Sequence, residues 1–177
     1  MPLVVRRHAK TCSTRCRVAR HRAHTIPKPL TSRERWVRHS ARKAPLTTAG
    51  KAASSTDSTT WSTHAEVKRS TSGVGIGFVL NGDGIVCLDL DHCISGKNLD
   101  PAVAQLLRSL PDTYIEISPS GHGLHVWGRG HLPAGRRTKV DGVPVEAYGT
   151  GRYITVTGKR WSKTNTLADL SGVLARL

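Results

Sequence analysis

The sequence predicts an α+β fold, and three features of its second half predict it. Residues 74–91 contain two strand-like runs separated by the turn signal Asn-Gly-Asp-Gly. Residues 101–110 carry apolar side chains at helical spacing, and residues 114–157 return to short alternating runs. A hairpin, a helix, several strands and a final helix in this order are typical of α+β domains.

The basic excess of the chain lies near its N-terminus. The net charge is +15, and residues 1–45 hold 13 Lys or Arg against the single acid Glu34. Blocks of like charge are usually solvated, and many bind nucleic acid through counterion release. The 177 residues suffice for one domain with a core. We therefore expect a basic, disordered tail at residues 1–30 and one catalytic domain at residues 31–177.

The cysteines and the hydropathy of the sequence indicate the cellular compartment in which the protein is expected. Four cysteines without a secretory signal predict thiols rather than disulfides. The motif C-x3-C-x4-H-x2-H at residues 12–24 offers zinc-competent ligands, but its spacing differs from that of the usual fingers, so no metal is assigned there. No apolar run reaches the ~20 residues of a membrane span. We expect a cytoplasmic protein without membrane contact; the Arg-rich N-terminus leaves a mitochondrial transit peptide as an alternative.

The elements before residue 73 are the least strongly marked. Capping residues favour one short helix over residues 31–36 and another over residues 57–65. Between them, proline and glycine favour an extended or turning segment over residues 44–50.

From residue 74 the pattern predicts each element more sharply. Val74–Leu80 and Ile85–Asp91 are expected to pair as a hairpin. Asp100 as the N-cap and Pro101 at the first helical position begin a helix that Pro111 ends. Further strands are expected at residues 114–118, 124–127, 143–148 and 153–157, followed by a final helix with the leucines of residues 167–177 on one stripe.

Two acids at the end of the second run are the first candidate site residues. Asp89 and Asp91 lie two positions apart, so a strand places both carboxylates on one face, with the apolar residues 86, 88 and 90 facing the core. Such a pair is costly without a cation, and Mg²⁺ prefers oxygen ligands and shares its shell with substrate phosphates. The pair predicts a metal-dependent phosphoryl-transfer site. Two solvated acids at a strand end are the alternative.

A glycine-rich loop forms the second segment. Gly121 and Gly123 follow Ser120 and allow a tight turn whose backbone N–H groups can approach phosphate oxygens. His125 opens the next strand and, by period two, shares a face with Trp127. The loop predicts a phosphate cradle beside the two acids. The alternative is an ordinary glycine-rich hairpin with a surface histidine.

A third carboxylate, Glu146, is expected on the outward face of the run at residues 143–148. The following Gly-Thr-Gly turn would bring Arg152 next to it, and an anion-binding arginine beside a metal-binding glutamate suits a nucleotide. The alternative is a structural ion pair between Glu146 and Arg152 across a hairpin.

Taken in chain order, these segments resemble the archaeo-eukaryotic primase superfamily, and most closely its bifunctional primase-polymerase (prim-pol) domains of phages and mobile elements. The D-x-D of Asp89 and Asp91, the S-G-x-G-x-H of Ser120–His125 and the acid Glu146 match the three motifs of that family. The resemblance covers about residues 33–160.

The resemblance implies a mainly antiparallel sheet like that of RNA-recognition folds, flanked by helices and joined to a small N-terminal α/β unit. It also implies template-directed nucleotidyl transfer by a DNA primase/polymerase, in which Asp89, Asp91 and Glu146 hold two Mg²⁺ or Mn²⁺ ions as catalytic residues. The nucleotide would be bound by Ser120, Gly121, Gly123, His125, Arg152 and Lys43.

The implied partners are a single-stranded DNA template and NTP or dNTP, in the host cytoplasm if the gene is phage-borne. Because no G-x4-G-K-[ST] segment occurs in the sequence, we expect a stand-alone enzyme, a truncated gene or the partner of a separately encoded helicase. Two other classes stay open. One is a catalytically inactive single-stranded nucleic-acid-binding module, and the other is a metal-dependent nuclease, which the phosphate cradle disfavours.

Overall fold

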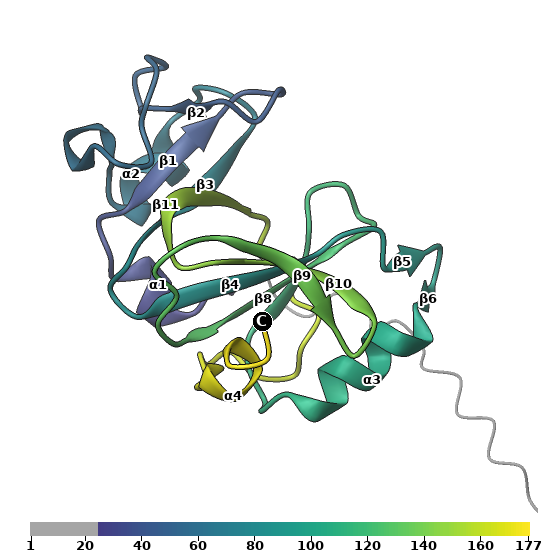
Figure 1. Ribbon diagram of the computed structural model, residues 1–177. Helices are drawn as coiled ribbons and strands as arrows, with labels where there is room; N and C mark the ends of the chain where they lie inside the picture. The colour runs from purple at the N-terminus through teal and green to yellow at the C-terminus, as the bar shows by residue number, and fades with distance from the viewer. Residues whose placement is uncertain (1–24) are drawn as a thin grey trace, which may run out of the picture.

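The computed structural model describes residues 25–177 and shows two antiparallel sheets packed against each other, with a few short helices (Figure 1). The α+β prediction is therefore confirmed. The larger sheet has the order β7 (Ile115–Ile117), β8 (Leu124–Arg129), β4 (Ile85–Leu90), β10 (Val143–Tyr148) and β9 (Arg136–Val140). The smaller sheet has the order β11 (Thr150–Val156), β3 (Gly75–Asn81), β1 (Trp36–His39) and β2 (Pro45–Leu46).

The remaining elements are short. β5 (Ile94–Ser95) and β6 (Asn98–Leu99) form a two-stranded ribbon, and the helices are α1 (Lys28–Thr31), α2 (His64–Arg69), α3 (Pro101–Ser109), α4 (Ser171–Leu174) and a 3₁₀ turn at Ser58–Thr60. In Figure 1, α3 and α4 lie on one side of the larger sheet and the smaller sheet lies on the other. The sheet that carries the candidate site is thus covered on both faces. On one of them the cover is a second sheet instead of the flanking helices that the resemblance implied.

β4 contributes to both cores, because its alternate residues face opposite ways. Val86, Leu88 and Leu90 pack with α3 in the first core, as the sequence predicted. Ile85 and Cys87 pack between the two sheets in the second core. The face that carries Asp89 is therefore closed along most of the strand and opens only at its C-terminal end.

Aromatic rings fill the space between the sheets. Phe78 of β3 and Trp127 of β8 are fully buried, and their ring centroids lie 5.9 Å apart with the planes at 80°. The ring centroids of Trp36 and Phe78 lie 5.2 Å apart, with the planes at 69°. These edge-to-face contacts join the two sheets, since Phe78 and Trp127 belong to different ones.

β3 and β4 do not form the hairpin that the sequence predicted. β3 pairs with β1 and β11, whereas β4 pairs with β8 and β10, so the Asn-Gly-Asp-Gly segment carries the chain from one sheet to the other. Gly82 and Gly84 adopt φ values of +87° and +88°, which glycine allows. The backbone N–H of Gly82 donates to the carbonyl of Gly149 at 2.9 Å, at the point where β10 crosses into β11. The connection from β3 to β4 and the connection from β10 to β11 therefore pass between the two sheets side by side.

Several helix predictions need correction. The helix expected over residues 31–36 is wrong: the chain forms α1 at Lys28–Thr31, and Trp36 belongs to β1 instead, where its ring fills the second core. In the second region, Asp57 caps only a 3₁₀ turn, and Thr63 caps α2 through a capping box with Glu66. The final helix is reduced to the single turn α4, because Leu167 and Leu170 are buried in the non-helical segment that precedes it.

The helix predicted between Asp100 and Pro111 is confirmed as α3. Asp100 accepts hydrogen bonds from the N–H groups of Ala102 and Val103 at 2.8 and 3.2 Å, and so caps α3. The edge strand β9, in contrast, had no counterpart in the prediction, since its residues Arg136–Lys139 are all polar and exposed.

Residues just upstream of residue 31 also pack with the rest of the protein, since Leu30 is fully buried and Ile26 packs against the second core. The predicted disordered tail and the Cys/His motif lie in residues 1–24, outside the described residues. Cys87 and Cys93 are free thiols, as expected, and burial raises the pKa of Cys93 to about 11. Within residues 25–177, the helices are all too short to span a membrane.

Phe78→Ala should lower the free energy of unfolding by about 3–5 kcal/mol, since it removes the ring that joins the two sheets. The control is Val74→Ala, because Val74 is 67% exposed and its truncation should change stability by less than about 0.5 kcal/mol. Chemical denaturation followed by tryptophan fluorescence measures both. Equal effects of the two variants would contradict this role of Phe78.

Candidate active site

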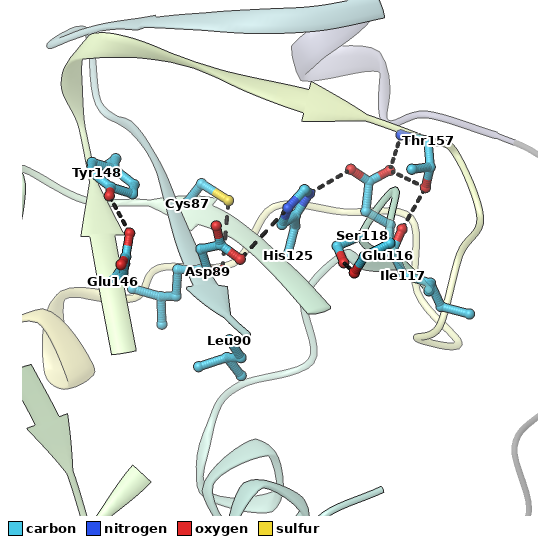
Figure 2. A network of polar contacts seen from close by, with 12 residues as sticks. Cys87, Asp89, Leu90, Glu116, Ile117, Ser118, His125, Glu146, Tyr148 and Thr157 are labelled. Carbon is cyan, nitrogen blue, oxygen red and sulfur yellow. Dashed lines mark hydrogen bonds and ion pairs between the residues drawn. The ribbon is translucent and has the colours of Figure 1, made fainter. Parts of the chain in front are cut away.

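One row of polar residues crosses the larger sheet from edge to edge. The register places Glu116 opposite His125, His125 opposite Asp89, Asp89 opposite Glu146, and Glu146 opposite Arg137. Directly opposed residues of antiparallel strands have side chains on the same face. The five residues, here called the polar row, therefore share one face. Figure 2 shows four of them side by side across the sheet, in the order Glu146, Asp89, His125 and Glu116. Directly opposed residues of the row are up to 57 positions apart in the chain, as Asp89 and Glu146 are.

Asp89 lies at the centre of the polar row and is only partly accessible. Its Oδ1 atom is buried and lies 3.7 Å from Nε2 of His125, which is too long for a hydrogen bond. Burial is the main cause that raises the pKa of the Asp89 carboxyl; His125 opposes this rise, while the carboxylates of Asp91 and Glu146 add to it. A positive charge lowers the pKa of a neighbouring carboxyl, so a buried acid of this kind ionises more readily when a cation lies beside it.

Glu116 holds the imidazole of His125 from the other side. Its carboxylate is fully buried, and Oε1 accepts from Nδ1 of His125 at 3.3 Å (Figure 2). Oε2 accepts from the Tyr114 hydroxyl at 3.0 Å and from the N–H groups of Thr157 and Gly158 at 3.2 and 2.8 Å. Every contact of this carboxylate is with a donor, so the ring is held with Nδ1 toward Glu116 and Nε2 toward Asp89.

Glu146 shares the face of Asp89, as the sequence predicted, but its partners differ from those expected. Its Oε1 accepts from Nε of Arg137 at 2.9 Å, and its Oε2 accepts from the Tyr148 hydroxyl. Arg152 instead lies over the Tyr148 ring, 4.5 Å from the centroid. The alternative interpretation, a structural ion pair between Glu146 and Arg152, is therefore wrong, because the chain passes into the other sheet between these two residues.

A cavity of about 620 Å³ opens beside Asp89, between the two sheets. Asp89, Asp91, His92 and His125 line it from the larger sheet, together with the loop Ser118–Ser120. Lys43 and Arg152 line it from the side of the smaller sheet, near Tyr153. Acidic and cationic groups thus face a common space, and both cationic residues that the sequence singled out are among those that line it.

The glycine-rich loop shapes one wall of the cavity. Ser118 and Ser120 place their hydroxyls 3.1 Å apart, and Gly121 has a φ of +78°. A Cβ atom on Gly123 would lie 2.9 Å from the carbonyl oxygen of Leu90, so only glycine allows this approach to the end of β4. The two glycines do not themselves border the cavity. They position the serines, which do.

The oxygen ligands available at this site suit a hard divalent cation, although they are not arranged as a complete coordination shell. Asp89 Oδ1 is a buried anionic oxygen without a hydrogen-bond partner in residues 25–177, which fits a ligand atom. Both oxygens of Glu146 already accept hydrogen bonds, and nowhere in the described chain do three His, Cys, Asp or Glu side chains converge closely enough to hold an ion as they stand. Binding by Asp89, Asp91 and Glu146 together would require these side chains to move closer to one another.

Sequence reasoning missed Glu116, Arg137 and Tyr148 as parts of this site. Glu116 lies in a strand-like run between two isoleucines, and an acid on the face opposite to them could have been flagged as buried. Its link to His125 depends on the register of β7 with β8, which no local pattern shows. Arg137 belongs to the strand that was not predicted at all.

Two comparisons with known proteins show the family of this chain. Residues 14–168 match the family described as bifunctional DNA primase/polymerase, N-terminal, so the match begins upstream of the region that the sequence motifs covered. The chain is also 38% identical over 132 residues to the DNA primase-polymerase of Nitratiruptor phage NrS-1. That similarity covers 68% of this chain and 18% of the phage protein, so the chain spans less than a fifth of its length.

Glu116→Gln should lower the free energy of unfolding by about 1–3 kcal/mol, because an amide NH₂ would face donors and leave one of them unpaired. Asp112→Asn, at an exposed loop position, should change it by less than about 0.5 kcal/mol. Urea denaturation measures both variants. A Glu116→Gln protein as stable as the wild type would show that the carboxylate is not needed to satisfy this network.

Proposed function

This chain belongs to the bifunctional DNA primase/polymerase family, and we propose that its cavity catalyses template-directed transfer of nucleotides to a growing strand. The observation that carries the proposal is the position of Asp89. Its unpaired oxygen lies where the polar row meets a cavity lined on the other side by Lys43 and Arg152. A site that has to hold a cation and a polyphosphate together needs this division of charge.

The triphosphate of the nucleotide would occupy the cavity. Arg152 is held against the Tyr148 ring, so its guanidinium can bind phosphate oxygens with little loss of freedom. Lys43 supplies a second positive charge, and the hydroxyl of Ser120 can donate from the loop. His125, oriented by Glu116, presents Nε2 to the same space.

The chemistry is one displacement at phosphorus. The 3′-oxygen of the growing strand bonds to the α-phosphorus of the nucleotide while the bond to the bridging oxygen of the pyrophosphate breaks, and the hydroxyl proton passes to solvent. When bound by Asp89, Asp91 and Glu146, Mg²⁺ or Mn²⁺ would offset the charge on the attacking and leaving oxygens. Glu116 keeps His125 in place, and Arg137 and Tyr148 do the same for Glu146.

The same proposal names the partners. A single-stranded DNA template and NTP or dNTP follow from the reaction, and a separately encoded helicase stays a prediction. The phosphate-binding wall of Ser120, Lys43 and Arg152 favours a nucleotidyltransferase over a nuclease, because hydrolysis of a strand requires no triphosphate.

Asp89→Asn should abolish incorporation of labelled nucleotide on a primed single-stranded template with Mg²⁺ or Mn²⁺. Loss of a residue that merely orients a metal ligand costs about 10- to 100-fold, so loss of the ligand itself should exceed 100-fold. Asp112→Asn is the matched control and should stay active. Wild-type protein that binds the strand without extending it would indicate an inactive binding module, and shortening of the strand without nucleotide would indicate a nuclease.

Arg152→Ala should lower kcat/KM for the nucleotide by about 10- to 100-fold, the loss expected for a hydrogen bond to a charged group. Arg108→Ala removes an exposed arginine from α3, on the other side of the larger sheet, and should leave kcat/KM unchanged. Steady-state extension assays with varied nucleotide concentration measure both. An unchanged kcat/KM in Arg152→Ala would remove Arg152 from the nucleotide site.

A further inference from the structure

The edge strand β9 carries positive charge on the face of the polar row. The register sets Arg137 opposite Glu146 and Lys139 opposite Pro144, so Arg137 and Lys139 share the face of Glu146. Both basic residues are exposed, and so is Pro144. Arg137 and Lys139 are here called the β9 basic strip.

The strip lies on the far side of Asp89 from the nucleotide cavity. Across the sheet the order is His125, Asp89, Glu146, Arg137. The cavity is bordered by His125 and Asp89, whereas Glu146 and Arg137 are not among the residues that line it. Figure 2 shows the same separation, with Glu146 on one side of Asp89 and His125 with Glu116 on the other.

In-line displacement sets the direction from which the second substrate arrives. The attacking and leaving oxygens lie on opposite sides of the phosphorus. With the triphosphate in the cavity, the growing strand has to reach Asp89 from the side of Glu146. We propose that the β9 basic strip binds the backbone phosphates of the growing strand close to its 3′ end. This inference rests on the proposed function and assigns the surface that would hold its second substrate.

The charges around the strip suit a polyanion. Arg137 donates Nε to Glu146, but its side chain is 72% exposed and the guanidinium has further N–H groups to offer. Lys139 forms no ion pair with any residue between 25 and 177. The acid nearest to it in sequence, Asp141, is paired with Arg176. Lysine and arginine that are free to meet phosphates gain affinity by releasing counterions.

Edge-strand protection is the competing explanation for these charges, because lysine on an exposed edge discourages pairing with other chains. Arg136 separates the two explanations. It lies on the same strand and is also exposed, but it belongs to the opposite face and donates to the carbonyl of Leu177 at 3.1 Å. Edge protection would need Arg136 as much as Lys139, whereas binding of the growing strand would need Lys139 but not Arg136.

The test compares Lys139→Ala with Arg136→Ala in the full chain; Arg137 is left intact because it also holds Glu146. Dissociation constants are measured by fluorescence anisotropy over a series of salt concentrations, for a hairpin primer-template with a recessed 3′ end and for the unprimed single strand. Lys139→Ala should weaken binding of the primed substrate several-fold and reduce its salt slope by about 1, with little effect on the single strand. Arg136→Ala should change neither.

Three outcomes would overturn the assignment. The first is that Lys139→Ala and Arg136→Ala weaken DNA binding equally. The second is that Lys139→Ala weakens binding of the primed and the unprimed substrate equally, and the third is that it does not weaken binding at all. Nucleotide incorporation by the wild type is measured in parallel. If it fails while Lys139→Ala still weakens binding of the primed substrate alone, the proposed reaction is wrong but the binding surface stands.

Discussion

The register of the five-stranded sheet is the constraint on which the site depends. Glu116, His125, Asp89, Glu146 and Arg137 come from five strands, and antiparallel pairing alone sets them side by side. A shift of one residue in β7, β8, β4 or β10 would turn its site residue toward the first core and bring an apolar neighbour into the row. The apolar alternation of these four strands, which fixes the first core, therefore also assembles most of the polar row, and β9 adds Arg137 by pairing with β10.

Burial on both faces makes this register hard to change. In β4, Leu88 is fully buried against α3, and Cys87 is fully buried against the smaller sheet. Only beyond Cys87 does the cover of the smaller sheet draw back, and Asp89 is the first residue of that face to reach the cavity. The Asp89 carboxylate thus emerges from a densely packed strand, which holds it in place without requiring hydrogen bonds to its own oxygens.

Much of the site could be predicted from the sequence because its motifs are local. Asp89, the loop that contains Ser120, His125 and Glu146 each lie in a segment whose alternation shows which face they occupy. The pairing between segments could not be predicted. The Asn-Gly-Asp-Gly turn suggested a hairpin, yet it carries the chain between sheets, because β4 finds its partners in β8 and β10. Glu116 and Arg137 matter only through that pairing, and so they were missed.

The cavity has walls from two sheets, with Asp89 and His125 on one side and Lys43 and Arg152 on the other. Its width is therefore set by the spacing of the sheets, and that spacing is maintained by the rings of Phe78 and Trp127, neither of which borders the cavity. The aromatic layer acts as a spacer. The width of the cavity is thus adjustable from a distance, through the volume of side chains that do not border it.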